Sequence, residues 1–139
     1  MRQITHLIIH CTDSPDSAIN VGVNQVRDWH VNGNGWSDIG YHWLIDKQAR
    51  ICQGRKEKTS GAHARGYNSI SVGMVWVGRN DCHEKQWTSL VLKGAEIVRR
   101  FDIPVENILG HCELPGVSKT CPNLNMTKYR NAVMQIIRG

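Results

Sequence analysis

The chain opens with the apolar stretch Gln3-Ile4-Thr5-His6-Leu7-Ile8-Ile9-His10. Its run of β-branched and aliphatic residues predicts a buried strand that carries His10 to the edge of a sheet. A second run that is nearly all apolar, over residues 71–77, predicts a central strand of the same kind. These two runs therefore predict a sheet at the centre of the fold whose central strands are buried.

The remaining segments predict a short hairpin and three helices. Strands are expected at residues 41–46 and 50–53, separated by a turn. Helices are expected from a cap at Asn24 to about Asn32, from a cap at Thr88 to Phe101, and from a cap at Asn125 to Arg138. The glycine-rich, polar residues 54–70 are typical of an active-site loop. We therefore expect an α/β fold with helices packed on a central sheet.

Composition narrows the class of protein. A chain of 139 residues with 40% hydrophobic and 21% charged residues predicts a single globular domain over residues 1–139. The net charge of +5 favours an anionic partner such as nucleic acid or an acidic cell-wall polymer. The basic residues are scattered, so we expect no direct nucleic-acid binding. No apolar run approaches the roughly 20 residues of a membrane helix, and the start lacks a signal-peptide pattern, so we expect no membrane association and a cytosolic location.

The cysteines favour reduced thiols over a disulfide framework. There are five of them, an odd number, widely spread in a chain with no export signal. Cys11 and Cys112 adjoin two candidate ligand histidines, and in extended chain neighbouring side chains point to opposite faces. We therefore expect both to be small apolar residues of the core.

Three residues form a candidate metal site: His10, His111 and Cys121. Each lies at the end of an expected strand or in a loop, where a side chain can reach a metal. His10 ends a strand, His111 follows a short apolar stretch ending in Gly110, and Cys121 lies in a loop next to Pro122. Catalytic zinc sites typically have three protein ligands and leave the fourth position for water. The residue types therefore indicate a catalytic zinc centre.

Several flanking stretches, in order, resemble the type-two, zinc-dependent N-acetylmuramoyl-L-alanine amidases. This family includes the phage amidase lysozymes, such as the phage T-seven endolysin, and the peptidoglycan recognition proteins. The matching stretches are residues 8–12, Gly35-Trp36-Ser37-Asp38-Ile39-Gly40-Tyr41-His42-Trp43, Gly61-Ala62-His63-Ala64-Arg65-Gly66-Tyr67-Asn68, residues 71–73, Gly110-His111-Cys112-Glu113 and Lys119-Thr120-Cys121-Pro122. They extend over nearly the whole chain.

The resemblance implies a mixed sheet flanked by about three helices, with one zinc ion in a surface groove. It also implies that His10, His111 and Cys121 hold the metal and that Tyr41 and Lys119 are catalytic. The residues themselves agree with these roles. Lys119 lies two positions before Cys121, which puts both side chains on one side of an extended loop, where an ammonium could stabilise developing negative charge. Tyr41 could offer its hydroxyl to the water or to the leaving nitrogen.

Other groove residues carry weaker signals. His63, in the glycine-rich loop, either lines the groove and binds substrate or is a solvent-exposed loop histidine. Trp36 and the stretch Arg79-Asn80-Asp81 are further groove candidates, whereas His30 and His83 carry no signal.

The leading functional hypothesis is a phage or prophage endolysin. It would cut the amide bond between the lactyl group of N-acetylmuramic acid and L-alanine in peptidoglycan, after storage in the host cytoplasm and release at lysis. The alternative is a non-catalytic peptidoglycan-binding receptor on the same fold, although such relatives tend to lose a zinc ligand. The resemblance also leaves open a role in binding a phage RNA polymerase.

Overall fold

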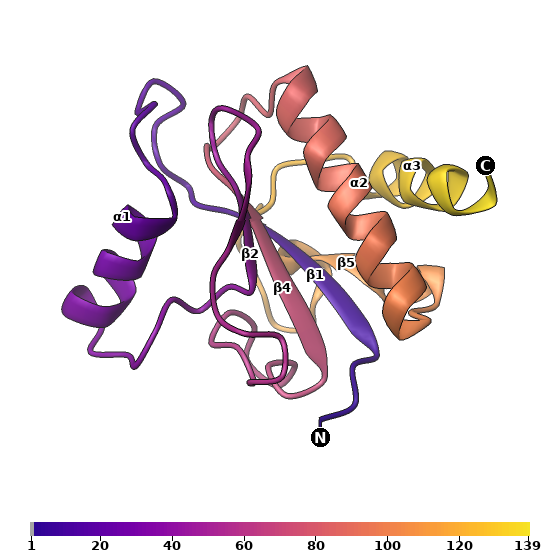
Figure 1. The fold of residues 1–139 in the computed structure, drawn as a ribbon, viewed down its shortest axis with the longest axis horizontal. Coiled ribbons are helices and arrows are strands. Elements are labelled where there is room, and N and C mark those ends of the chain that lie inside the picture. The colour runs from indigo at the N-terminus through magenta and orange to yellow at the C-terminus, as the bar shows by residue number, and fades with distance from the viewer. Residues whose placement is uncertain (1) are drawn as a thin grey trace.

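The computed structural model describes residues 2–139 and contains a five-stranded sheet (Figure 1). Its strands are β1 (His6–Cys11), β2 (Trp43–Ile45), β3 (Ile51–Gln53), β4 (Ser71–Trp76) and β5 (Ile108–Gly110). They lie in the order β3-β2-β4-β1-β5. β3 runs antiparallel to β2, and the other neighbouring pairs are parallel. The sheet is therefore mixed, as expected.

Three α-helices flank this sheet: α1 (Val23–Asp28), α2 (Glu84–Phe101) and α3 (Met126–Arg138). A π-helical turn, η1 (Trp29–Gly33), continues α1. Two short 3-10 turns, η2 (Val105–Asn107) and η3 (His111–Glu113), flank β5. In Figure 1, α2 and α3 lie together on the right, and α1 lies apart on the left. The single-domain α/β prediction agrees with this arrangement.

The alternation of side chains along β1 separates the core from the functional face. Leu7, Ile9 and Cys11 are buried in the cluster that packs under α2 and α3. Successive side chains of a strand point to opposite faces, so Ile8 and His10 face the other side. Ile8 belongs there to a separate apolar cluster. His10 thus reaches the face that carries the loops, although it is itself only 2% exposed.

Side chains also alternate along β4, and those on one face of this strand pack against α1. Val75 lies with Val26 of α1 in an apolar cluster against which Tyr41 packs. Val72, Met74 and Trp76 instead contribute to the core under α2 and α3. β4 is buried along its whole length, which agrees with the central strand expected at residues 71–77.

Two predicted helix starts are wrong, and one is confirmed. α2 begins a turn before Thr88, because His83 and Gln86 form a reciprocal cap in which each side chain accepts from the other's backbone N–H at 3.3 Å. The first helix is preceded by Gly22, so Asn24 lies inside α1 rather than at its cap. Asn125 does cap α3, since its side chain accepts from the backbone N–H of Lys128 at 3.0 Å.

The predicted strands are right in place but too long. β1 begins at His6 instead of Gln3, and β2 begins at Trp43, which leaves Tyr41 in the loop that precedes it. β5 was expected only as a short apolar stretch. It becomes a strand because it pairs with β1, a partner about 100 positions away in the chain.

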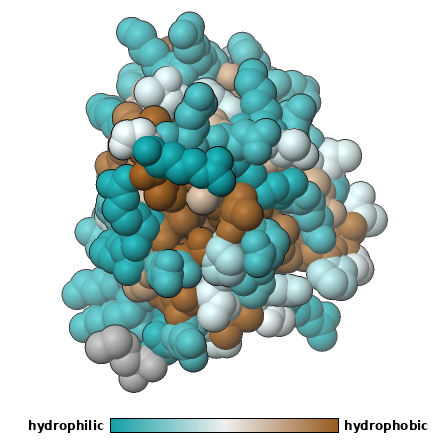
Figure 2. All heavy atoms as spheres, turned by 90° about the vertical axis from the view of Figure 1, so that its right-hand side faces the viewer, coloured by the Kyte–Doolittle hydropathy of each residue, from teal (hydrophilic) through white to brown (hydrophobic). Residues whose placement is uncertain are grey.

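The face of the molecule on the α3 side is largely hydrophilic. On this face, shown in Figure 2, hydrophobic residues appear mainly in a central area surrounded by hydrophilic residues. Among residues 2–139, no helix is long and apolar enough to cross a membrane.

Candidate metal centre and active site

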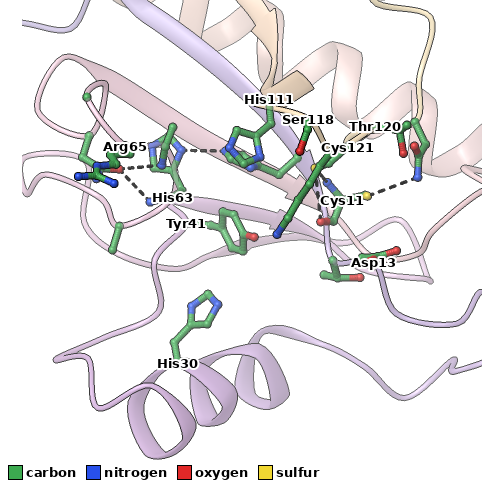
Figure 3. A pocket seen from close by; sticks show the side chains of 18 of the residues that line it. Cys11, Asp13, His30, Tyr41, His63, Arg65, His111, Ser118, Thr120 and Cys121 are labelled. Carbon is green, nitrogen blue, oxygen red and sulfur yellow. Dashed lines mark hydrogen bonds between the residues drawn. The ribbon is translucent and has the colours of Figure 1, made fainter. Parts of the chain in front are cut away.

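The candidate ligands meet in a surface pocket of about 880 Å³. His10, His111 and Cys121 each offer a ligand atom, and these atoms all lie within 4.8 Å of one another. The ring centroids of His10 and His111 are 4.7 Å apart. Figure 3 shows His111, Cys121 and Tyr41 converging on this space from separate segments of the chain. The structure therefore brings together the three residues that the sequence singled out.

His111 is held by the turn that follows β5. The Glu113 carboxylate accepts from the backbone N–H of Gly110 at 2.8 Å and from Arg130 of α3 at 2.8 Å. This pair ties the turn η3, which carries His111, to α3. Glu113, the acidic residue that adjoins the motif, therefore supports the backbone of the site.

Cys121 is held by backbone contacts on both sides. The backbone N–H of Cys11 donates to Sγ of Cys121 at 3.1 Å, and the backbone N–H of Cys112 donates to the carbonyl of Cys121 at 2.7 Å. These bonds return the loop to the ends of β1 and β5, where His10 and His111 lie.

The expectation for the other cysteines holds in part. Cys11 is a core residue at 5% exposure, as expected. Cys112 is only half-buried and lies in η3, so its prediction as a core residue is wrong. The turn after β5 replaces the extended chain that the prediction assumed. All five cysteines are free thiols.

Burial keeps the two histidines neutral, which is the form that binds metals. Burial lowers the pKa of His10, and His63 and His111 lower it further. Burial also lowers the pKa of His111, assisted by the positive charge of Lys119. The hydrogen bond with Cys11, together with burial, raises the pKa of Cys121. A bound cation would have to displace this thiol proton, as metals do when they bind cysteine.

The donor set fits zinc. Two imidazole nitrogens and one thiolate are ligands of the kind found in catalytic zinc sites, and tetrahedral bond lengths of about 2.0–2.3 Å place such donors about 3.3–3.6 Å apart. The three ligand atoms lie within 4.8 Å of one another, so small side-chain rotations would bring them to the distances at which one ion binds all three. The wide pocket leaves room for a further ligand beside them.

Tyr41 and Lys119, the predicted catalytic residues, both line this pocket. The ring of Tyr41 is 5.0 Å from that of His10, and its hydroxyl points into the pocket (Figure 3). Burial raises the pKa of Tyr41, with further contributions from Cys121 and Cys11. The hydroxyl therefore keeps its proton and can donate a hydrogen bond. Lys119 is exposed, and its ammonium lies near enough to His111 to lower the pKa of that histidine.

The weaker groove candidates divide into two groups. His63 and Trp36 line the pocket. The backbone N–H groups of Arg79, Asn80 and Asp81 instead donate to the Asp16 carboxylate, and this stretch does not line the pocket. Its prediction as a groove segment is therefore wrong, because it forms a turn closed by a carboxylate.

His30 and Arg65 also line the pocket, although sequence reasoning missed both. His30 lies in η1, and its ring packs at a tilt against the rings of Trp36 and Tyr41, with centroids 4.7 and 5.5 Å away. Its Nδ1 accepts from the backbone N–H of Gly40 at 2.8 Å. Nothing in the residues around His30 indicates this position, since the contact depends on how α1 packs. Arg65 lies inside the Gly61–Asn68 stretch, where the same loop that carries His63 could have suggested it.

Comparisons with known proteins identify the family. The family model described as N-acetylmuramoyl-L-alanine amidase matches residues 1–124. The chain belongs to this family. The endolysin of Escherichia phage T7 is 41% identical over 143 residues, which cover 96% of this chain and 91% of that protein. Peptidoglycan-recognition protein SC2 of Drosophila melanogaster is 30% identical over 131 residues, covering 88% of this chain and 70% of that protein.

A solved structure shows the same fold. The N-acetylmuramoyl-L-alanine amidase LysC from Clostridium intestinale superposes with a TM-score of 0.82 at 24% identity, over 96% of this chain and 87% of that one. The family match and the 41% identical endolysin show that the chain is an N-acetylmuramoyl-L-alanine amidase that acts on peptidoglycan.

Proposed function

We propose that the chain is a zinc-dependent endolysin that cleaves the amide bond between the lactyl group of N-acetylmuramic acid and L-alanine. The observation that carries this proposal is the convergence of His10, His111 and Cys121 in a pocket that also contains Tyr41 and Lys119. A zinc ion held by the three ligands would supply an activated water and polarise the amide carbonyl.

The chain's own residues supply the remaining chemistry. The Tyr41 hydroxyl points into the pocket and donates a hydrogen bond to the reacting amide group. The Lys119 ammonium stabilises the negative charge that develops on the carbonyl oxygen in the transition state. Trp36 and His30 form an aromatic wall beside Tyr41, against which a substrate can pack. The net charge of +5 favours approach to an acidic wall polymer.

Metal analysis tests the ligand set. Purified protein should hold about one zinc per chain, and a strong chelator should abolish activity until zinc is restored. Cys121→Ala should lose the metal. Cys52→Ala is a matched control, because Cys52 lies in β3 and does not line the pocket. Full zinc content in Cys121→Ala would show that the ligand assignment is wrong.

End-group analysis tests the bond. Digested peptidoglycan should gain free amino groups on L-alanine with no rise in reducing sugar ends. The described residues that line the pocket include no pair of carboxylates such as glycoside hydrolysis requires. New reducing ends would indicate a glycosidase. A zinc-loaded protein that binds the wall without cleaving it would be a receptor.

The endolysin role includes storage in the host cytoplasm and action on the wall after release. This part of the proposal rests on the similarity to the endolysin of phage T7. Binding of a phage RNA polymerase is a separate proposal, suggested by resemblance alone, and a pull-down with the cognate polymerase would decide it.

A further inference from the structure

His63 makes a direct contact with a candidate metal ligand. Its Nδ1 lies 2.8 Å from Nε2 of His10, and the two rings meet edge to face with centroids 4.9 Å apart. Figure 3 shows this bond as a dashed line that leaves His63 toward the cluster around His111. A histidine that binds a metal through one nitrogen usually donates from the other to a fixed acceptor. The contact leaves Nδ1 of His10 for the metal.

The far side of the His63 ring fixes which nitrogen carries the proton. Its Nε2 lies 3.2 Å from Oγ of Ser71, and that hydroxyl donates to the backbone carbonyl of Tyr67 at 2.7 Å. A serine hydroxyl has a single hydrogen, so Ser71 can only accept from His63. Nε2 of His63 therefore carries the proton, and Nδ1 is the acceptor for the N–H of His10.

Two glycines make the space for this ring. A Cβ atom at Gly73 would lie 2.6 Å from the ring of His63, and one at Gly61 would lie 2.5 Å from it. Gly73 is in the middle of the buried strand β4, where a glycine otherwise weakens a strand. The side chain of Asn68 accepts from the backbone N–H groups of His63 and Ala64 at 2.8 and 2.9 Å and fixes the loop. The ring is thus held from several sides.

We infer that His63 is a positioning residue that holds His10 with Nδ1 free for the metal, through the hydrogen-bond chain His10–His63–Ser71. This inference rests on the proposed metal site and deepens it. It replaces the predicted substrate contact of His63, because both ring nitrogens are already engaged within the protein.

Zinc affinity, measured by competition with a chromophoric chelator, tests the inference apart from activity. His63→Ala should weaken zinc binding about 10–100-fold, the usual effect of removing such a partner. His63→Asn should recover most of this loss, because its amide oxygen occupies the position of Nδ1. His30→Ala is the matched control: this histidine lines the same pocket but contacts Tyr41 and Trp36, so zinc affinity should not change.

Each outcome separates the inference from the proposed function. If the wild-type protein binds no zinc, both the proposed metal site and the inference are wrong. If the wild-type protein binds zinc and His63→Ala binds it with the same affinity, the inference is wrong but the proposed metal site stands. A loss of activity in that variant would then favour the original prediction that His63 contacts substrate. If His63→Ala does not fold, Ser71→Ala tests the inference instead, because it keeps the His63 ring but removes the hydroxyl that accepts from it. Weaker zinc binding in Ser71→Ala supports the hydrogen-bond chain His10–His63–Ser71, and unchanged zinc binding refutes it.

Discussion

Replacing Lys119 by methionine separates a catalytic cation from a merely favourable surface charge. Methionine keeps much of the length of the side chain but removes the ammonium. Lys119 is exposed, so the fold and the zinc content should not change. If the ammonium stabilises the developing oxyanion, its loss should lower kcat by about 10²–10³, which corresponds to about 2.7–4 kcal/mol of barrier.

The competing explanation is a general loss of attraction to the wall. The substitution lowers the net charge from +5 by one, and such attraction is screened over a Debye length of about 10 Å at 0.1 M salt. Lys85→Met makes the same change on an exposed position of α2, outside the pocket. Turnover of a soluble muropeptide should fall only in Lys119→Met. Rates within about threefold of wild type for Lys119→Met, or equal losses in both variants, would refute the catalytic role.

Three further predictions follow from the structure. Tyr41→Phe should keep its zinc and lose most of its turnover, measured by metal analysis beside a muropeptide assay; retention of full activity would make Tyr41 a packing residue. Gly94→Ala should lower the free energy of unfolding by about 1–3 kcal/mol in urea titrations, because its Cβ would collide with the Tyr129 hydroxyl; an unchanged midpoint would contradict this. Burial opposes ionisation of Glu57, but hydrogen bonds from Arg100 and Trp43 outweigh it and lower the pKa below the usual 4.5. The stability advantage of wild type over Glu57→Gln should therefore be full above pH 4.5 and shrink as the pH falls below it, and a constant difference from pH 7 to 3 would refute this.

Features that depend on short-range chemistry can be predicted from the sequence. The alternation along β1 predicts that His10 leaves the core while its neighbours enter it, because successive strand residues face opposite sides. The helical spacing of apolar residues and the cap at Asn125 predict α3, since both signals lie within one segment. The residue types of His10, His111 and Cys121, with their flanking stretches, indicate the metal chemistry and the family.

The contacts between distant segments, in contrast, depend on the assembled fold. His63 is 53 positions from His10 in the chain, and no local pattern predicts that their rings share a hydrogen bond. His30 enters the pocket because α1 packs against the sheet beside Tyr41. Gly73 weakens a strand by local rules, yet it is needed because a ring from another loop lies against it. Propensity and periodicity act over a few residues, whereas these contacts depend on packing between elements, so they appear only once the sheet and its loops are assembled.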